Sequence, residues 1–537
     1  METFTVGDHT VAVSNYQHVK RIFTEDFVAL LVKLHETLEP KRQSLLNARR
    51  ERQLRFDGGE VPQFEPNKSE AVTGSWKVAP LPEILLTRRV EITGPVNSAK
   101  MVINMLSRNG AGARADCAML DFEDSMKPSW NNVLDGVVNV IGAAQRSLSF
   151  TQDGAQGGAE KSYSLDPQDM ALPMVRCRGL HLNESNVRID GVSISGGLFD
   201  LAATYYHAAE HFIEQGMVPK YYVPKVEHYL EARWWDDLFS QLEDSLGHKR
   251  STLRATFLIE TLTAAFQIEE ILYEIRDHAA GMNVGRWDKI FSDIKVLRAH
   301  PNRISADRSQ IDMSCPWMKN YALRVIEICH GRGAFAMGGM AAFTPGKDEQ
   351  ARKAQTDKVI ADKQFEFGIG HDGCWVSHPY FIGPALEQFK KQNQLQVTGV
   401  LPNKYPDLLP ESLGTRTEAG VRKNIRVAIA YMQGWEHDIG CVAWDNLMED
   451  LATLEISRAQ IWQWVHHNAL LDDGRPVTKK LVSDLFADEY EKIVTELGAE
   501  VIASGRWENA YGEAKKLFLN DRFQEFLSLE SDLFTES

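Results

Sequence analysis

Cysteine is scarce in this sequence, and the few cysteines present are not spaced as ligand or disulfide pairs. The six cysteines among 537 residues lie at positions 117, 177, 315, 329, 374 and 441, and no Cys-x-x-Cys pair occurs. This spacing supports neither a zinc site nor a disulfide framework. We expect reduced thiols, as in a protein of the cytosol.

Long hydrophobic runs and an excess of positive charge are also missing. No segment approaches the roughly 20 apolar residues of a membrane helix, and the first residues, METFTVGDHTVAVSNYQ, lack the basic and apolar regions of a secretory signal. Lys and Arg number 59 against 74 Asp and Glu, a net charge of −15. Nucleic-acid binding without sequence preference needs the opposite balance. We therefore expect no membrane and no nucleic acid among the partners, although a local basic pocket for an anion remains compatible with this charge.

The sequence does contain the material for several packed domains. Hydrophobic residues make up 43% and charged residues 25%, which is typical of a globular protein, and the chain is too long for one ordinary core. In TEDFVALLVKLHETLEPKRQSLLNARRERQL, apolar residues recur every three to four positions. This pattern predicts a helical region over residues 1–87.

From residue 88 onward, short apolar runs alternate with amphipathic helical stretches. The eight candidate strands are RRVEITG, CAMLDF, LPMVRCR, YYVPKV, ATFLIET, GMNVG, AFAMGG and CWVSHP. Eight strands with helical connections predict an α/β protein, a (β/α)₈ barrel, over residues 88–395. A Gly- and Ser-rich stretch around residues 148–170 predicts a hairpin inserted before the third strand.

The pattern changes again after the last candidate strand. Prolines and glycines over residues 396–420 are typical of a linker or long loop. Amphipathic segments such as RKNIRVAIAYMQGWEHD and EDLATLEISRAQIWQWVHH follow it. We expect a C-terminal helical domain over residues 421–537.

Ionisable residues follow the apolar bodies of several candidate strands. Catalytic groups of a (β/α)₈ barrel lie at the C-terminal ends of its strands. A single charged residue at such a position usually meets only solvent, but its recurrence at the same end of several strands indicates a site. The residues concerned are Asp121, Glu123, Asp124, Arg176, Arg178, Lys225, Glu260, Asp288 and His378.

Two of these carboxylates could hold a metal ion. Glu260 follows TFLI, a run suited to a buried strand, and a buried carboxylate must pair, protonate or bind a cation. Glu260 and Asp288 lie one β/α unit apart and should converge at the barrel mouth, where two carboxylates with open water positions suit Mg²⁺. The alternative is a salt bridge from Glu260 to Arg176 or Lys225.

Two further motifs have competing interpretations. Asp450, in NLMEDLATLEIS, lies where a helix begins, so it either complements the helix dipole or serves as a general base brought over the barrel mouth. The sequence leaves both open. GGMAAFTPGKDE is no phosphate-binding loop, because Ala341 replaces the required glycine and Asp348 follows the lysine.

Several blocks resemble those of the malate synthase family in its shorter, A-type form. In order along almost the whole chain they are RRVEITGPV, DFEDSMKPSWNNV, VRCRGLHLNE, ATFLIETLTAAFQIEEIL, RDHAAGMNVGRWDKIFSDIK, GAFAMGGMAAFTPGKDE, GIGHDGCWVSHP and LMEDLATLEISRAQIWQWVHH. The resemblance implies a barrel with an N-terminal helical clasp and a C-terminal helical plug. It also implies a transferase that condenses acetyl-CoA with glyoxylate and hydrolyses the thioester to malate and CoA. One departure is Val284, where the family usually has a cysteine.

The resemblance also implies roles for individual residues. Glu260 and Asp288 match the Mg²⁺ ligands, Arg176 the active-site arginine and Asp450 the general base. Asp121 and Glu123 would hold metal-bound waters. The substrate-binding positions are Gly285, Arg286 and Trp287, and the positions near CoA are Trp375 and Pro379.

Other assignments remain open at this level. A related barrel lyase acting on malyl-CoA-like thioesters is the runner-up, and a catalytically silent binding protein on the same scaffold is the third possibility. By analogy with the family we expect a monomer or homodimer. The C-terminal LFTES lacks the Ser-Lys-Leu peroxisomal address, which favours the cytoplasm.

Overall fold

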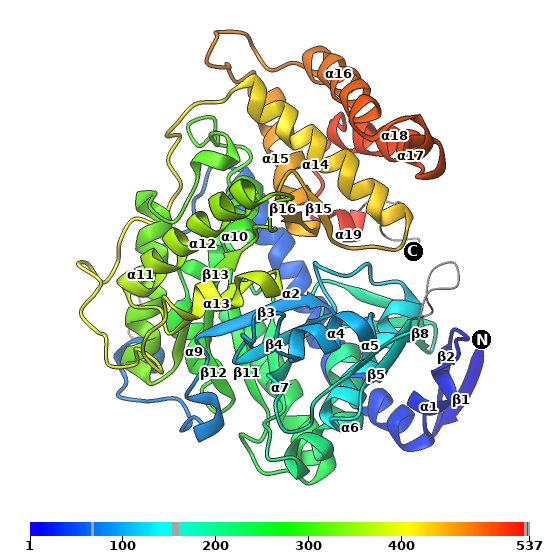
Figure 1. Cartoon of the computed structure of the whole chain (residues 1–537). Coiled ribbons are helices and arrows are strands. Elements are labelled where there is room, and N and C mark those ends of the chain that lie inside the picture. Colours follow the sequence, from blue (N-terminus) through cyan, green and yellow to red (C-terminus); the bar gives the residue numbers. More distant parts are fainter. Residues whose placement is uncertain (66–68, 153–159, 531–533, 535–537) are drawn as a thin grey trace.

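The centre of the molecule is a closed barrel of eight parallel strands (Figure 1), in a computed structural model that describes residues 1–65, 69–152, 160–530 and 534. Strand β14 pairs with β3 and closes the barrel. The strands are β3 (Val90–Pro95), β4 (Cys117–Asp121), β7 (Leu172–Arg176), β10 (Lys220–Val223), β11 (Arg254–Ile259), β12 (Ala279–Val284), β13 (Phe335–Ala341) and β14 (Gly373–Val376). All eight candidate strands, and with them the (β/α)₈ fold, are confirmed.

Helices connect the strands around the outside of the barrel. They are α4 (Ala99–Leu106), α5 (Trp130–Ala144), α6 (Gly196–Glu214), α7 (Tyr229–Leu246), α8 (Leu262–Ala265), α9 (Ile268–Glu274), α10 (Arg286–Val296), α11 (Pro316–Arg332), α12 (Glu349–Ile369) and α13 (Ile382–Leu386). Between β11 and β12 the chain forms two short helices, α8 and α9, rather than one continuous helix. No helix among the described residues combines the length and the apolarity that a membrane crossing requires.

Side chains fill the inside of the barrel and leave no pore through it. Alternate residues of a strand point inward, and a buried cluster contains Met119, Met174, Tyr222, Leu258 and Trp375. A ligand of the barrel must therefore bind beyond the ends of the strands rather than inside it.

The prediction that the chain begins with helix is wrong for its first residues. β1 (Glu2–Val6) and β2 (His9–Val13) form a hairpin that pairs with β8 (Asn183–Ile189), which in turn pairs with β9 (Val192–Ser195). Val11 and Val13 are buried in alternation, the period of a strand with one face covered. The short strand β2 is stabilised by β8, which lies far away in the sequence, and local periodicity does not reveal this pairing.

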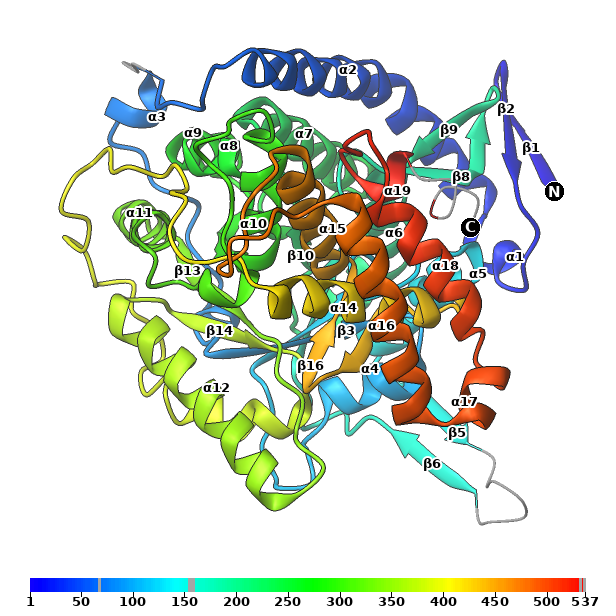
Figure 2. The ribbon, with the colours of Figure 1, turned by 90° about the horizontal axis from the view of Figure 1, so that it is seen from above.

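The long N-terminal helix α2 (Glu25–Asp57) agrees with the predicted helical period. Thr24 caps its first turn by accepting a hydrogen bond from the Phe27 N–H. The helix lies along the outside of the barrel and packs on α7 (Figure 2). A buried ion pair between Arg49 and Glu231, 2.6 Å long, ties the two helices together. Two short helices, α1 (Val19–Ile22) and α3 (Glu70–Thr73), flank α2.

Two antiparallel strands lie where the sequence predicts an inserted hairpin. They are β5 (Ser149–Gln152) and β6 (Lys161–Ser164), and they pair in register from Ser149–Ser164 to Gln152–Lys161. The intervening residues 153–159 lie outside the described part of the chain.

The C-terminal part is mainly helical and covers one end of the barrel (Figure 2). Its first helix begins at Glu418, three residues before the predicted boundary, and the helices share a hydrophobic core of their own. A short hairpin, β15 (Val442–Trp444) and β16 (Leu447–Glu449), departs from the all-helical expectation. The helices are α14 (Glu418–Glu436), α15 (Leu451–His466), α16 (Lys479–Leu497), α17 (Ala499–Ser504), α18 (Trp507–Phe518) and α19 (Leu527–Glu530).

His278, buried just before β12, should make the stability of the barrel depend on pH. Burial by itself lowers the pKa of His278, but hydrogen bonds to Asp236 (2.6 Å) and Glu243 (3.1 Å) of α7 outweigh it and raise the pKa to about 9. A raised folded-state pKa gives stability that is complete below the unfolded value of 6.5 and disappears as the pH rises through about 9. The contribution is on the order of 3 kcal/mol.

We expect His278→Gln to lower the urea midpoint of unfolding more near pH 6 than near pH 10, because Gln carries no charge at either pH. Parallel urea titrations of the two proteins measure the difference. An equal loss at both pH values would contradict a protonated His278 in the folded protein.

Candidate active site

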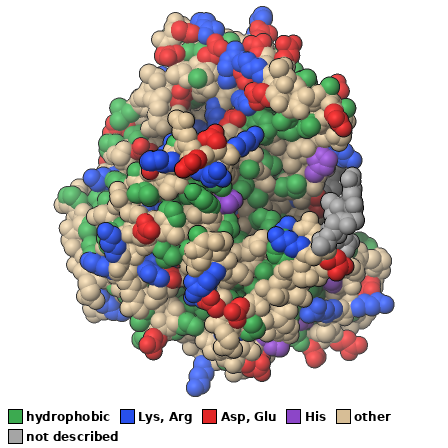
Figure 3. Space-filling view, in the orientation of Figure 1, with side chains coloured by type: hydrophobic (Ala, Val, Ile, Leu, Met, Phe, Trp, Pro, Cys, Tyr) green, Lys and Arg blue, Asp and Glu red, His purple; other side chains and the backbone are tan. Residues whose placement is uncertain are grey.

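A cavity of about 610 Å³ lies between the C-terminal ends of the barrel strands and the C-terminal helices. Arg176, Glu260 and Trp375 line it from the barrel, and Met448 and Asp450 line it from the C-terminal part. Figure 3 shows the side of the molecule that faces the reader in Figure 1. Hydrophobic side chains gather across its middle, between the C-terminal part above and the barrel below. The cavity lies at the end of the barrel where such folds place their active sites.

Glu260 and Asp288 both line this cavity, but they lie on different kinds of element. Glu260 directly follows β11 and is 1% exposed. Asp288 lies in the first turn of α10, because β12 ends at Val284 and the helix begins at Arg286. Asp288 therefore follows the C-terminal end of β12, as the sequence predicts, and its carboxylate lines the cavity at the barrel mouth.

The environment of the two carboxylates disfavours their charged forms. Burial, with the Asp288 carboxylate adding to it, raises the pKa of Glu260 well above its usual value. Burial also raises the pKa of Asp288, although Lys225 opposes the effect. A bound cation would relieve this cost, because it stabilises both ionised carboxylates at once.

Lys225 lies at the centre of these carboxylates. Its Nζ contacts Glu123, Asp124 at 2.7 Å and Asp288 at 3.3 Å, and its backbone N–H donates to Glu260 Oε1 at 2.9 Å. A salt bridge between Glu260 and Lys225 was the alternative to metal binding. Among the described residues, the Lys225 side chain forms a salt bridge with Asp288 and not with Glu260. Lys225 has a φ of +53°, in the left-handed region that a residue with a side chain rarely adopts. The cluster keeps this strained backbone in place.

Gly285 leaves the Glu260 carboxylate accessible. A Cβ at this position would lie 2.7 Å from Glu260 Oε2, so any side chain here would displace that oxygen. Two oxygen ligands with free positions beside them fit Mg²⁺, which keeps several waters. No group of three or more His, Cys, Asp or Glu side chains suited to a metal is found within the described residues, so the pair does not resemble a closed structural site.

Arg176 is held by Asp121 on the floor of the cavity. Its Nε and Nη2 each donate to an Asp121 oxygen at 2.6 Å, and Nη1 lies 3.3 Å from Glu123. Burial alone would raise the pKa of Asp121, but Arg176 holds it below its usual value. Neither Asp121 nor Glu123 lines the large cavity; Asp124 does. The contact of Asp121 and Glu123 with metal-bound waters therefore stays a prediction. In the structure, Asp121 orients Arg176.

Asp450 caps α15 and faces the cavity. Its Oδ1 accepts from the Thr453 N–H at 3.2 Å, and the Thr453 hydroxyl in turn accepts from the Asp450 N–H at 3.0 Å. Among the described residues, Oδ2 accepts no hydrogen bond. Burial, together with Asp124 and Asp288, raises the pKa of Asp450 well above its usual value. The two interpretations of Asp450 are thus compatible, since one oxygen caps the helix and the other remains available.

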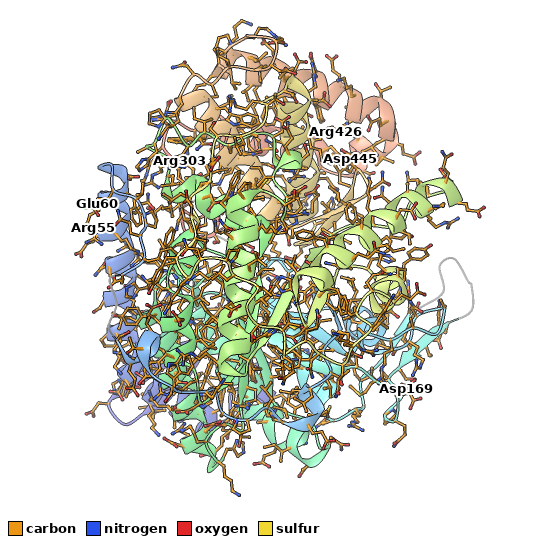
Figure 4. The ribbon with its side chains drawn as sticks, turned by 90° about the vertical axis from the view of Figure 1, so that its left-hand side faces the viewer. Arg55, Glu60, Asp169, Arg303, Arg426 and Asp445 are labelled. Carbon is orange, nitrogen blue, oxygen red and sulfur yellow. The ribbon has the colours of Figure 1, made fainter. Side chains whose placement is uncertain are left out.

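The hairpin β15–β16 positions Asp450 over the barrel. The Met448 N–H donates to the Ala342 carbonyl at 2.7 Å, directly after β13, and the Leu451 N–H donates to the Asp124 carbonyl at 3.3 Å. Glu449 forms a buried ion pair of 2.9 Å with Arg308. On the outer side of the hairpin, Asp445 points toward Arg426 of α14 (Figure 4).

The remaining predicted positions also line the cavity. They are Gly285, Arg286, Trp287, Trp375 and Pro379. The Arg286 guanidinium lies 4.2 Å from the centre of the Trp287 ring. The Trp375 indole N–H donates to Glu91 at 3.1 Å inside the barrel, which fixes the ring at the cavity floor. Val284 lines the same cavity, so the departure from the family pattern lies at the site wall.

Sequence reasoning did not assign roles to Lys225, Asp124, Arg308 and Glu449. Lys225 and Asp124 were visible as ionisable residues after strands, but nothing in the chain shows that they contact each other. Arg308 and Glu449 are 141 positions apart in sequence, and nothing in the motif around Glu449 shows that it pairs with Arg308.

The fold and the cavity together define a class of protein. A (β/α)₈ barrel whose mouth combines two neighbouring buried carboxylates, an oriented arginine and an aspartate from a covering domain has the groups that an enzyme needs for metal-assisted acid–base chemistry.

Comparison with known proteins identifies the family. Family models match residues 11–70 (malate synthase, N-terminal domain), 172–404 (malate synthase, TIM barrel domain) and 415–532 (malate synthase, C-terminal). Malate synthase A of Escherichia coli K12 is 42% identical over 98% of both chains. The malate synthase of Myxococcus xanthus is 43% identical over 95% of this chain and 93% of its own, and the glyoxysomal enzyme of Candida tropicalis is 44% identical over 88% and 86%. The chain belongs to the malate synthase family.

Gly285→Ala should weaken Mg²⁺ binding by on the order of tenfold, because its Cβ would push Glu260 Oε2 away. Calorimetric titration of the folded variant with Mg²⁺ measures the change. Gly512→Ala in α18 is the matched control, since nothing lies within 4 Å of a Cβ there. Equal Mg²⁺ affinity in both variants would contradict the assignment of Glu260 as a ligand.

Proposed function

We propose that this chain catalyses the malate synthase reaction: acetyl-CoA condenses with glyoxylate, and hydrolysis of the thioester then releases malate and CoA. The convergence of Arg176, Glu260, Asp288 and Asp450 on one cavity carries this proposal, because the four residues come from separate elements and have complementary chemistry. An acyltransferase of this type needs an electrophile site, a base and an anion stabiliser in one place.

Glu260 and Asp288 are the proposed ligands of Mg²⁺. When bound, Mg²⁺ polarises the aldehyde of glyoxylate and holds its carboxylate. Gly285, Arg286 and Trp287 line the same wall and bound the space for this small substrate. Lys225 keeps the two carboxylates in position by binding Asp288 through its side chain and Glu260 through its backbone N–H.

Asp450 and Arg176 share the activation of acetyl-CoA. The thioester methyl group is a very weak carbon acid, so a base alone removes its proton too slowly. Asp450 takes the proton through its free Oδ2, and the permanent charge of Arg176 stabilises the oxygen of the resulting enolate. The raised pKa of Asp450 makes its carboxylate a stronger base than an exposed aspartate.

The lining of the cavity also fits this reaction. The cavity is lined mainly by apolar side chains around a few charged ones, which excludes bulk water from the enolate. Trp375 and Pro379 lie on its wall, and we assign the acyl end of CoA to this region.

Two other properties belong to the same proposal. We infer a cytoplasmic enzyme, in keeping with the reduced cysteines, all of which are free within the described residues. We also infer a monomer or homodimer; sedimentation velocity at several protein concentrations distinguishes the two.

A thiol-release assay tests the reaction as a whole. CoA should appear only when acetyl-CoA, glyoxylate and Mg²⁺ are all present. A lyase would instead convert malyl-CoA to acetyl-CoA and glyoxylate without net thiol release, and a silent binding protein would release nothing. Either result would overturn the proposal.

Asp450→Asn should abolish condensation and keep ligand binding. Asn retains the helix cap but is no base, so we expect kcat to fall by about 10² to 10⁴-fold. Calorimetry should show unchanged binding of glyoxylate and Mg²⁺. Asp445→Asn, at the tip of the same hairpin and outside the cavity, is the control and should keep its turnover. Near-normal turnover of Asp450→Asn would remove the general-base role.

Glu260→Gln and Asp288→Asn should each shift the Mg²⁺ dependence of the rate to higher concentration by at least about tenfold, because an amide oxygen is a neutral and weaker ligand. Rates at saturating glyoxylate across a Mg²⁺ series measure the shift. Asp244→Asn removes an exposed carboxylate on α7 and serves as the control. An unchanged metal titration in both variants would exclude this pair as the ligands.

A further inference from the structure

A second cavity, of about 220 Å³, adjoins the first one behind the carboxylate cluster. Asp124 and Ala452 line both cavities, so these two side chains form a shared wall. The remaining lining comes from the segments after β4, β7 and β10, the β8–β9 hairpin, the end of α14, the start of α15 and the segment around α19, and it includes Lys225. Neither the condensation chemistry nor the binding of glyoxylate and acetyl-CoA uses this space.

The lining of the second cavity suits water. Glu123 and His181, 6% and 4% exposed, each contribute a buried polar atom, Oε2 and Nδ1, that forms no hydrogen bond among the described residues. Arg176 Nη1 lies 3.3 Å from Glu123 Oε2, but the two atoms do not form a hydrogen bond. Buried polar atoms left in this state are typical partners of ordered water. The volume exceeds by several times the roughly 30 Å³ of one water molecule.

The second cavity also reaches the surface. Ser185 of β8 and Leu529 of α19 line it and are exposed. Within the described part of the chain, water can therefore enter from outside and reach the shared wall without passing through the large cavity.

The two halves of the reaction make opposite demands on water. The enolate must be kept from bulk water, yet the later step consumes one water molecule. The acyl-CoA occupies the large cavity during both steps, so the mouth of that cavity is a poor entry for the water. This reasoning rests on the proposed function.

We propose that the second cavity is a water chamber, and that the water for thioester hydrolysis passes from it between Asp124 and Ala452. The water oxygen adds to the thioester carbonyl carbon of malyl-CoA, and the C–S bond breaks. The sulfur leaves with one proton of the water as the CoA thiol, and the other proton is released as the new carboxyl group ionises to malate.

Narrowing the chamber should slow hydrolysis and spare condensation. Ser193 of β9 and Ser528 of α19 line the second cavity but not the first, and they enter it from different elements. Ser193→Leu and Ser528→Leu each replace a small hydroxyl with a bulky apolar group. Ser164→Leu on the exposed strand β6 is the matched control, because Ser164 lines neither cavity.

Single-turnover reactions quenched with acid separate the two steps. We expect wild type and Ser164→Leu to form malate with no build-up of malyl-CoA. In the two chamber variants, malyl-CoA should form at the wild-type rate and then disappear at least about tenfold more slowly. The same delay should appear when synthetic malyl-CoA is supplied with Mg²⁺ and no glyoxylate.

Two results would overturn the chamber. In the first, both variants hydrolyse malyl-CoA as fast as Ser164→Leu. In the second, condensation slows in step with hydrolysis, which indicates a distorted site rather than a lost water supply. Each variant is tested separately, and thermal unfolding midpoints confirm that it is folded. Failure of the proposed function gives a different result, because wild type itself would then release no malate: a silent binding protein would form neither malyl-CoA nor malate, and a lyase would form malyl-CoA without hydrolysing it.

Discussion

Uncompensated negative charge at the barrel mouth is the constraint on which the rest of this site depends. Within the residues that the structure describes, five buried carboxylates, of Asp121, Glu123, Asp124, Glu260 and Asp288, surround two buried cations, Arg176 and Lys225. Removing carboxylates from water is costly unless each one is paired or hydrogen-bonded. Arg176 and Lys225 satisfy the inner part of the cluster, and Glu260 and Asp288 remain at the cavity wall with raised pKa values. The excess of negative charge raises the free energy of the cluster, and the same excess attracts a divalent cation.

The cluster also connects the barrel to the C-terminal domain. Asp124 binds Lys225 through its carboxylate, and its carbonyl accepts the N–H of Leu451, one residue after Asp450. The hairpin before Asp450 adds a second connection, at Ala342 beyond β13, and the Arg308–Glu449 pair adds a third. These three contacts hold the segment that carries Asp450 against the barrel. The proposed base is therefore placed by domain packing, whereas the proposed metal ligands follow β11 and β12 of the barrel itself.

The parts of this architecture that follow from local patterns were predictable. Each barrel strand is a short, largely apolar run, and helices connect the strands, although the β8–β9 hairpin comes between β7 and α6. This repetition is why eight strands were placed correctly. The same reasoning failed for β1, β2, β8, β9 and the β15–β16 hairpin, because these strands are short and are stabilised by partners remote in the chain. It did place Asp288 correctly after β12, but it did not show that Asp288 lies in the first turn of α10.

By itself, the sequence determined the barrel, its order along the chain and the residue types available at the mouth. It also determined the family, because long blocks of the chain match known relatives. Only the tertiary structure decided which charges meet: Lys225 with Asp288, Asp121 with Arg176, and Asp450 above them. It also decided that a second cavity adjoins the first across Asp124 and Ala452. The physical reason is that electrostatic contacts and cavities depend on distances across the fold, whereas a strand or a helix leaves its period in consecutive residues.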